Sequence, residues 1–404
     1  PQTREHLAIL DLLQINAGLV AITKIDLVDR DWLDLVVVDV EDVLTDTGLE
    51  GAPVVPVSAM TRDGLDELVS TLEGLLQRTP PKKDLDRPRL PIDRAFTIAG
   101  FGTVVTGTLV DGRLEVGQEV ELTTSGKRGR IRGLQTHGQK LESAEPGSRV
   151  AANLTGLSHE EIDRGEVLTL PGWLRPSEAI DVRLKVLPEA PNPIRHNMFV
   201  TVHTGSSEVI GRVRLLEKRV ADPGDTTWAQ IKLESPLAVV KGDYYVIRSN
   251  QTTLGGGSIA DPHGRRHRRM HRPVLDHLDA MEQGSEVDLL LKTIELSEPA
   301  EFQGLVNRAN LRPEDAKNRL TSMAEEGLVV PLGGKPIGPG VLIHTAPGWA
   351  SMSEMARRAL EAYHGLFPLR KGAPKEELRS RLGLSPQVFN LVLPKLEQSG
   401  VIVE

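Results

Sequence analysis

Two short polar segments follow apolar strands near the start of the chain. Thr23-Lys24-Ile25-Asp26 comes directly after the apolar run Leu19–Ile22, and Ser58-Ala59-Met60 comes directly after Pro53–Val57. Open α/β sheets bind ligands at the carboxyl ends of their strands. A carboxylate there accepts hydrogen bonds from the ring N–H and the exocyclic amine of guanine, two donors that adenine does not offer together. The predicted guanine-binding residues are Thr23, Lys24, Asp26, Ser58 and Ala59.

Further chemistry is suggested by two charged residues, Asp93 and Arg94, at the entrance of the stretch Arg89–Gly112. Apolar and polar residues alternate on either side of the turn Gly100-Phe101-Gly102, which predicts a β-hairpin, and Asp111-Gly112 is a second hairpin signal. By pattern alone the two charges are a surface ion pair at the start of a strand, worth at most about 1 kcal/mol.

The densest positive charge in the chain is the run Arg265-Arg266-His267-Arg268-Arg269. Such a run is either a solvated linker or a contact for nucleic-acid phosphates. His263, His267 and His271 are spaced by four residues, which suggests a metal site, but the flanking arginines oppose a bound cation. We therefore predict phosphate contact through Arg265, Arg266, Arg268 and Arg269, and no metal.

Several segments resemble nucleotide-binding motifs but do not match them fully, which limits the reactions that we expect of this chain. No GxxxxGK[ST] phosphate loop occurs in the sequence, since Gly126-Lys127 and Gly334-Lys335 lack the required neighbours. Asp261–Gly264 matches DxxG by letters but follows a β region, and the glycines of Gly100–Gly107 do not open a helix. Phosphoryl transfer needs phosphate-binding and magnesium-binding groups. We therefore expect no GTP hydrolysis by this chain and name no catalytic residue.

These residues must be positioned by several domains, because the 404 residues exceed the usual size of one domain. Alternating strands and amphipathic helices, one of them predicted to be capped by Asp63, make 1–80 half of a βαβ fold. Thr79–Lys83 is a linker. Alternating β patterns predict barrels over 88–171 and 173–264. Two rounds of helix, helix and Gly-led strand, over 273–346 and 348–404, predict winged helices, the second ending in the strand Gly400–Val403.

The bulk composition excludes several classes of protein. The apolar share of 39% is enough for real cores, and the net charge of −8 argues against a generally sticky nucleic-acid binder. The chain has no cysteine, which excludes disulfides and thiolate metal sites. It also has neither a signal-peptide pattern nor a run long enough to span a membrane, so we expect a cytoplasmic location and no membrane partner.

Taken together, these motifs resemble a translational GTPase of the elongation factor Tu type. The resemblance rests on Pro1–His6, Thr23–Asp26, Ser58-Ala59 and Gly102–Gly107. Three more segments, together with the winged helices after the barrels, make the resemblance specific to the bacterial selenocysteine-specific elongation factors (SelB). These segments are Ile92–Thr97, Leu254–Pro262 and Pro374–Gly383. The similarity covers essentially the whole chain. Against that family, the chain is expected to be a fragment that starts after the phosphate loop and switch regions and stops within the second of four winged helices.

The resemblance implies roles for particular residues. The residues that match the family's selenocysteine pocket are Asp93, Arg94 and Arg149, with His137 a weaker candidate. A selenol is an anion at neutral pH, and two guanidiniums stabilise it far more than they stabilise a neutral serine. The family also implies GTP as cofactor, with Mg²⁺ in the intact protein. Implied partners are selenocysteinyl-tRNA, the ribosome and an mRNA hairpin, the last bound by C-terminal winged helices absent here.

Two alternatives to a selenocysteine-specific factor remain open from the sequence. One is a winged-helix nucleic-acid-binding regulator that carries an inert GTPase-like remnant. The other is a general elongation factor Tu-like GTPase, which should lack the helical C-terminal third of this chain.

Overall fold

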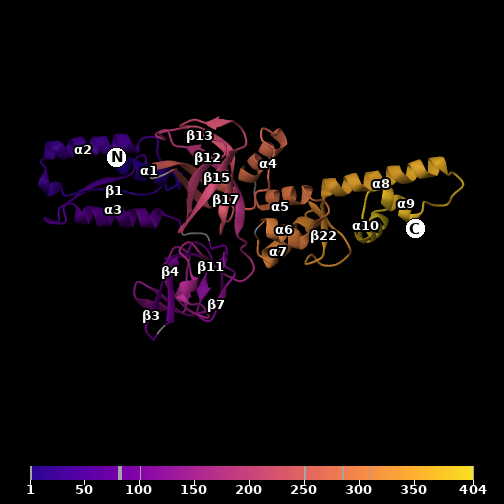
Figure 1. The fold of residues 1–404 in the computed structure, drawn as a ribbon, viewed down its shortest axis with the longest axis horizontal. Helices are drawn as coiled ribbons and strands as arrows, with labels where there is room; N and C mark the ends of the chain where they lie inside the picture. The colour runs from indigo at the N-terminus through magenta and orange to yellow at the C-terminus, as the bar shows by residue number, and fades with distance from the viewer. Residues whose placement is uncertain are drawn as a thin grey trace. The chain divides into compact units, whose positions relative to one another are not determined.

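The computed structural model describes residues 2–80, 84–100, 102–249, 252–283, 286–309 and 311–403. The chain forms two compact units, Pro1–Leu275 and Asp276–Glu404, which we describe separately (Figure 1). Part of the predicted linker (81–83) and Phe101 of the predicted turn lie outside the described residues. The predicted combination of a partial GTPase-type α/β region, two β-barrels and winged helices is confirmed.

The N-terminal α/β region holds two parallel strands, in which Val20 pairs with Val54 and Thr23 with Val57. Its elements are α1 (Gln2–Leu12), β1 (Val20–Thr23), α2 (Arg30–Leu44), β2 (Val54–Val57) and α3 (Leu65–Arg78). The expected cap of α3 by Asp63 is wrong. Gly64, with φ of 72°, is the N-cap instead, and the Asp63 side chain accepts the Thr61 hydroxyl at 2.7 Å. A Cβ on Gly64 would lie 2.0 Å from the Pro56 carbonyl oxygen, so only glycine fits this turn.

The first barrel follows the α/β region. Its strands are β3 (Arg89–Ile98), β4 (Gly102–Thr108), β6 (Glu119–Leu122), β7 (Arg128–Thr136), β10 (Arg149–Thr155) and β11 (Val167–Thr169). Pairing of β10 with β7 closes the ring, and β8 (Gln139–Leu141) extends β7 as a hairpin. Alternate residues such as Leu90, Ile92 and Val105 point inward and form its core.

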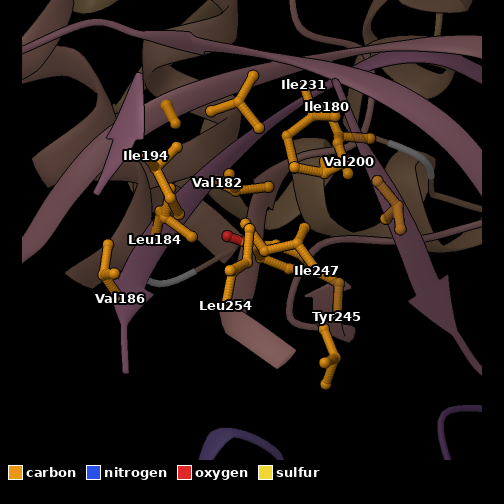
Figure 2. Close-up of a cluster of buried hydrophobic side chains, with 14 of the residues drawn as sticks. Ile180, Val182, Leu184, Val186, Ile194, Val200, Ile231, Tyr245, Ile247 and Leu254 are labelled. Atoms are coloured by element: carbon orange, nitrogen blue, oxygen red, sulfur yellow. The ribbon is translucent and has the colours of Figure 1, made fainter. Parts of the chain in front are cut away.

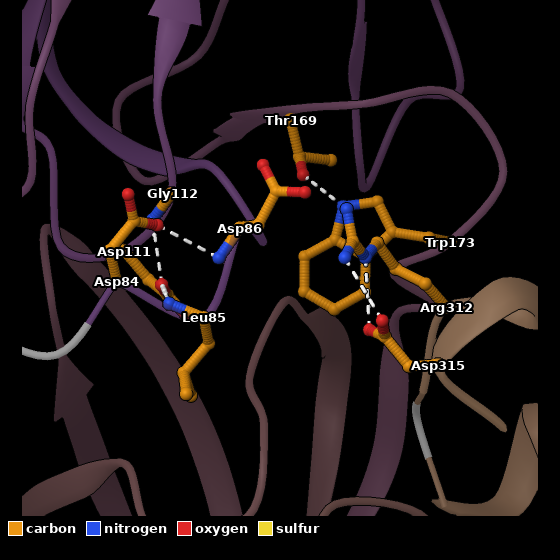
Figure 3. A network of polar contacts seen from close by, with 9 residues as sticks. All are labelled: Asp84, Leu85, Asp86, Asp111, Gly112, Thr169, Trp173, Arg312 and Asp315. Carbon is orange, nitrogen blue, oxygen red and sulfur yellow. Dashed lines mark hydrogen bonds and ion pairs between the residues drawn. The ribbon is translucent and has the colours of Figure 1, made fainter. Parts of the chain in front are cut away.

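The hairpin predicted at Asp111-Gly112 is wrong, although a turn is present there. The short strand that follows, β5 (Leu114–Glu115), pairs with β9 (Ser143–Ala144) and not with β4. The Asp111 carboxylate accepts the backbone N–H groups of Leu85 and Gly112, at 2.9 and 2.6 Å (Figure 3). The Asp111 carbonyl accepts the N–H of Arg89 as well. The turn therefore fixes the entry of the barrel instead of joining two paired strands.

The second barrel is a closed ring of strands with a fully buried aliphatic core. Its strands are β12 (Ser177–Val186), β14 (Met198–Thr204), β15 (Ser207–Leu215), β17 (Thr226–Leu237), β18 (Tyr244–Ser249) and β19 (Thr252–Asp261), with β13 (Ile194–Arg195) and β16 (Val220–Ala221) paired beside them. Figure 2 shows this core, which includes Ile180, Val182 and Tyr245. Leu12 of α1 belongs to the same cluster, and Asp11 pairs with Lys185 at 2.7 Å. The α/β region is thus packed on this barrel.

Hydrogen bonds and a small apolar cluster that includes Val167 and Ala238 join the barrels. Arg89, at the start of β3, donates both Nη1 and Nη2 to the carboxylate of Asp243, at 2.6 and 3.0 Å, with both side chains mostly buried. The Ser207 hydroxyl donates to the Gly165 carbonyl at 2.6 Å. Where the chain leaves the first barrel, Trp173 Nε1 donates to the Thr169 hydroxyl (Figure 3). A bidentate guanidinium–carboxylate contact also fixes orientation, so β3 is held against the second barrel.

The second unit consists of helices with short strands. Its elements are α4 (Arg272–Gln283), which begins in the first unit, α5 (Glu286–Glu295), β20 (Ala300–Glu301), α6 (Phe302–Ala309), α7 (Pro313–Glu325), β21 (Val329–Pro331), β22 (Leu342–Thr345), α8 (Ala346–Leu366), α9 (Lys375–Arg381) and α10 (Pro386–Gln398). The strands β20, β22 and β21 form one sheet.

The expected final strand is not observed, because the described residues 401–403 pair with no other strand. Val401 and Ile402 instead pack on the hydrophobic cluster of α8, α9 and α10. Among the described residues, no helix has the length and apolar character required to cross a bilayer.

Candidate functional site

The two predicted guanine-binding segments lie side by side. The parallel pairing of β1 and β2 ends both strands at the same edge, and there the Ser58 hydroxyl donates to the Asp26 carboxylate at 2.5 Å. Ser58 is fully buried, and its hydroxyl also accepts the backbone N–H groups of Met60 and Thr61, both at 3.2 Å. Thr23 is the last residue of β1, and Ala59 directly follows Ser58. Ser58 therefore fixes one oxygen of Asp26 and shapes the loop that contains Ala59.

Lys24 adopts the left-handed conformation, with φ of 64°, directly after β1. Lysine rarely adopts this backbone conformation, which here turns the chain sharply into the short helix Ile25–Leu27. Lys24 and Asp26 are both exposed at the strand ends. The loop thus offers a carboxylate with one oxygen fixed and a long aliphatic stem beside it, a combination that fits the edge and face of a guanine base.

A β-bulge lies at the start of the first barrel. Ile92 pairs with Gly107 and Arg94 with Thr106, so Asp93 is an extra residue in β3. Ile92 and Ala95 both pack into the barrel core, although residues three apart in a regular strand point to opposite faces. The bulge resolves this conflict by placing both Asp93 and Arg94 outside the core. Two adjacent charged side chains are thereby presented together.

The bulge brings Asp93 to Arg149, which the sequence placed 56 residues away. Arg149 Nη1 donates to one carboxylate oxygen of Asp93, and the Thr106 hydroxyl donates to the other at 2.7 Å. The hydrogen bond from Arg149 holds the pKa of Asp93 below its usual value, and the bond from Thr106 and the charge of Arg94 lower it further. Arg149 stays half exposed and Arg94 exposed. The site thus has two available guanidiniums around one ionised carboxylate.

His137, the weaker candidate, lies in a turn beside the start of β10. It occupies the tight turn between β7 and β8, with φ of 48°, and it is exposed. The neighbouring Thr136 hydroxyl donates to the Arg149 carbonyl at 2.8 Å, which holds this turn against the start of β10. The pairing of β7 with β10 therefore brings the backbone of His137 near that of Arg149. No hydrogen bond joins the two side chains in the described structure.

Thr106 and Thr136 are site residues that the sequence reasoning missed. The sequence did contain a signal for Thr106. If the two strands are paired outward from the turn at Gly100–Gly102, one residue at a time on each side, Thr106 lies opposite Arg94. The bulge at Asp93 carried no such signal. Thr136 gave none either, since its role depends on the pairing of β7 with β10, which are separated by β8 and β9 in the chain.

The basic run divides into anchoring and exposed side chains. His267 Nε2 lies 2.6 Å from the fully buried Asp181 carboxylate. Arg269 donates to the carbonyls of Leu215 and Lys218, at 2.9 and 3.2 Å. Arg265, Arg266 and Arg268 are exposed. Phosphate contact therefore remains a prediction for all four arginines, but Arg269 already donates to the protein.

The histidine spacing does not produce a metal site in the described structure. Residues 263–271 precede α4 and are not helical, so the spacing of four does not place the rings on one face. Within the described ranges, no group of three or more His, Asp or Glu side chains is arranged to hold a metal ion.

Four family models match consecutive parts of the chain. The elongation factor Tu GTP binding domain matches residues 1–78, and elongation factor Tu domain 2 matches 102–169. The β-barrel domain of selenocysteine-specific elongation factor matches 181–266, and a winged helix of elongation factor SelB matches 357–404. The last two distinguish this chain from a general elongation factor Tu. They also favour a translation factor over a regulator that carries an inert remnant.

Similar proteins agree with these models. A selenocysteine-specific elongation factor of Desulfomicrobium baculatum is 38% identical over 420 aligned residues, which cover 100% of this chain and 64% of that protein. The chain therefore spans less than two thirds of the length of this relative. The crystal structure of a bacterial selenocysteine-specific elongation factor matches with a TM-score of 0.75 at 21% identity, over 98% of this chain and 62% of that one. The apo form of SelB from Methanococcus maripaludis matches with a TM-score of 0.58 at 25% identity, over 64% and 61%.

Proposed function

The chain belongs to the family of selenocysteine-specific elongation factors, and on this premise we propose that it acts in GTP-dependent delivery of selenocysteinyl-tRNA to the ribosome at recoded UGA codons. The observation that carries the proposal is the cluster of Asp93, Arg94 and Arg149 on the first barrel. A general factor that carries neutral amino acids has no need of two guanidiniums at its aminoacyl site.

The charge balance of this cluster suits a selenolate. Asp93 neutralises one of the two guanidiniums, so the cluster has a net charge of +1 before the ligand binds. A selenolate then meets Arg94 and Arg149, which remain charged at all relevant pH values. The carboxylate of Asp93 is available to the α-ammonium group of the same aminoacyl end. A serine hydroxyl carries no charge, so it gains little from the same arginines.

Guanine recognition is assigned to the loops after β1 and β2. Asp26 would accept the ring N–H and the exocyclic amine, Lys24 would cover one face of the base, and the Ala59 N–H would donate to its oxygen. GTP supplies the nucleotide whose state controls release of the tRNA, and Mg²⁺ would accompany its phosphates. The hydrogen bond from Ser58 keeps Asp26 in one orientation before the nucleotide binds.

The decisive test compares the affinities for selenocysteinyl-tRNA and for its seryl precursor. Because a charge-assisted hydrogen bond contributes about 1.5–3 kcal/mol, Arg94→Ala and Arg149→Ala should each weaken selenocysteinyl-tRNA binding roughly tenfold or more. Binding of seryl-tRNA should change much less. Filter binding or fluorescence titration with both tRNAs gives the ratio, and equal affinities of the unaltered chain for the two would contradict the pocket.

A further inference from the structure

Arg149 is the first residue of β10, and its backbone is held from two sides. On one side it pairs with Thr108 of β4. On the other side, the regular pairing of β10 with β7 ends at Ala151 and Gln135, before it reaches Arg149. There the Thr136 hydroxyl donates to the Arg149 carbonyl at 2.8 Å. A side chain thus continues the contact between these two strands past the end of their regular pairing.

Thr136 is suited to hold this position because its backbone and its side chain are both constrained. It is the last residue of β7 and pairs with Gln139 of β8 across a two-residue turn. Both turn residues, His137 and Gly138, have a positive φ, of 48° and 78°, as in the tight turns that fit the twist of a hairpin. The β-branched side chain also has few rotamers. The hydroxyl therefore has a set direction before any ligand arrives.

The position of the Arg149 backbone determines where its guanidinium can reach. The side chain crosses β4 to β3, where Nη1 donates to one oxygen of Asp93, while the Thr106 hydroxyl of β4 donates to the other. The Arg149 side chain is half exposed, so packing alone does not fix it. A displacement of the start of β10 would therefore weaken this ion pair and move the guanidinium relative to Arg94.

We propose that Thr136 is a positioning residue for selenocysteine selectivity, an assignment that deepens the proposed function and rests on it. Its hydroxyl holds the Arg149 backbone, and the backbone holds the guanidinium where Asp93 and a selenolate can both contact it. Such preorganisation lowers the entropy lost when a ligand binds. A seryl end gains little from the arginine, so loss of the hydroxyl should weaken binding of selenocysteinyl-tRNA more than binding of seryl-tRNA.

The test removes the hydroxyl and keeps the shape of the side chain. Thr136→Val in the full chain should lower the ratio of the affinities for selenocysteinyl-tRNA and seryl-tRNA about three- to tenfold, the range expected for one hydrogen bond. Thr136→Ser keeps a donor at this position and should restore most of the ratio. Thr155→Val is the matched control, because the Thr155 hydroxyl donates to the Arg130 carbonyl at 3.3 Å between the same two strands, at their other end. It should leave the ratio unchanged.

A second measurement follows the position of Arg149 without any tRNA. The hydrogen bond from Arg149 holds the pKa of Asp93 below its usual value. NMR titration of the Asp93 carboxyl carbon should therefore give a higher pKa in Thr136→Val than in the unaltered chain, and a restored pKa in Thr136→Ser. Thr155→Val should leave this pKa unchanged. A merely structural role of Thr136 would lower the free energy of unfolding without shifting the titration.

Two results would overturn the assignment. The first is an unchanged affinity ratio in Thr136→Val, since the hydroxyl would then not determine selectivity. The second is an equal loss of the ratio in Thr136→Ser or in Thr155→Val, because the effect would then not depend on a hydroxyl at this site. Failure of the proposed function is recognised separately. The unaltered chain would then bind both tRNAs equally, and the selectivity role would fall with it, whereas the pKa of Asp93 would still show whether Thr136 holds Arg149.

Discussion

The two barrels of the first unit use charged side chains in opposite ways. In the first barrel, the bulge of β3 directs Asp93 and Arg94 outward, and Arg149 joins them while it remains half exposed. In the second barrel, Asp181 is fully buried on β12, where Gln230 and His267 satisfy it. A charge that stays partly solvated is available to a ligand, whereas a buried charge must be satisfied by the protein itself. The cluster of the first barrel is therefore accessible to a ligand, as the proposed function requires, whereas Asp181 holds neighbouring segments of the second barrel together.

From this comparison of the two barrels, we expect the largest loss of stability when Asp181 is substituted. We expect Asp181→Ala to destabilise the second barrel by about 3–5 kcal/mol, because it leaves His267 and the Gln230 amide without their buried partner. Amide hydrogen exchange in β17 measures this loss within the barrel, and exchange in β7 of the first barrel is the internal control. A loss below about 1 kcal/mol would show that the buried pair does not hold this region together.

The next largest effect is expected at the joint between the barrels. Arg89→Ala removes a mostly buried bidentate pair and leaves the Asp243 carboxylate with fewer donors, which should cost about 1–3 kcal/mol. Protease cleavage between the barrels, near Trp173, should become faster, while each barrel keeps its own exchange pattern. Arg130→Ala, which breaks the exposed pair with Glu119, is the matched control and should leave cleavage unchanged.

The buried cluster around Asp181 and the exposed pair of Asp93 should contribute to stability with opposite dependence on pH. The hydrogen bond and charge of Asp181 raise the pKa of His267 even though burial lowers it, and burial raises the pKa of Asp261 to about 6. These two groups bind more protons in the folded state than in the unfolded state, so their contribution to stability should fall as pH rises from about 4 toward 8. Burial lowers the pKa of His196, His203 and His263 in the same barrel, and these groups contribute the opposite slope. Asp93 has a lowered pKa, so its contribution is present above about pH 4 and is lost below that.

The measurement for this prediction is hydrogen exchange of β17 and β7 across that pH range, corrected for the intrinsic exchange rate. His267→Gln should flatten the dependence of β17 above pH 6 and leave β7 unaffected. An unchanged slope of β17 in His267→Gln would contradict the raised pKa of His267.

The smallest expected change in stability is at Asp93 itself. Asp93→Asn breaks an exposed ion pair, so the free energy of unfolding should change by about 1 kcal/mol or less. Binding should respond much more, because the net positive charge of the cluster rises while the partner of the α-ammonium group is lost. Urea unfolding followed beside tRNA titration separates the two quantities. A large loss of stability would show that the ion pair of Asp93 and Arg149 stabilises the fold, as Asp181 does in the second barrel, and would contradict this prediction.

Much of the fold was predictable from the sequence because it depends on local patterns. Alternation of apolar residues located the barrels, and strand ends located Asp26 and Ser58, whose contact follows from parallel pairing. The prediction that Arg149 lies near Asp93 rested on the family resemblance alone. Their contact requires β10 to pair with β4 and β4 to pair with the bulged strand β3, and no local pattern indicates these pairings. The buried contact of His267 with Asp181 joins residues 86 apart, and no local pattern indicates such a partner.

The extra residue in β3 also determines which kind of mutation would erase the site. Deleting Asp93 would restore strict alternation through this strand and would retain Ile92 and Ala95 in a closed barrel. The same sequence would then fold into a barrel without adjacent outward charges. On the proposed function, ligand selectivity in this domain would depend on the register of one strand, and the gain or loss of a single codon would separate a barrel that binds a ligand from one that does not.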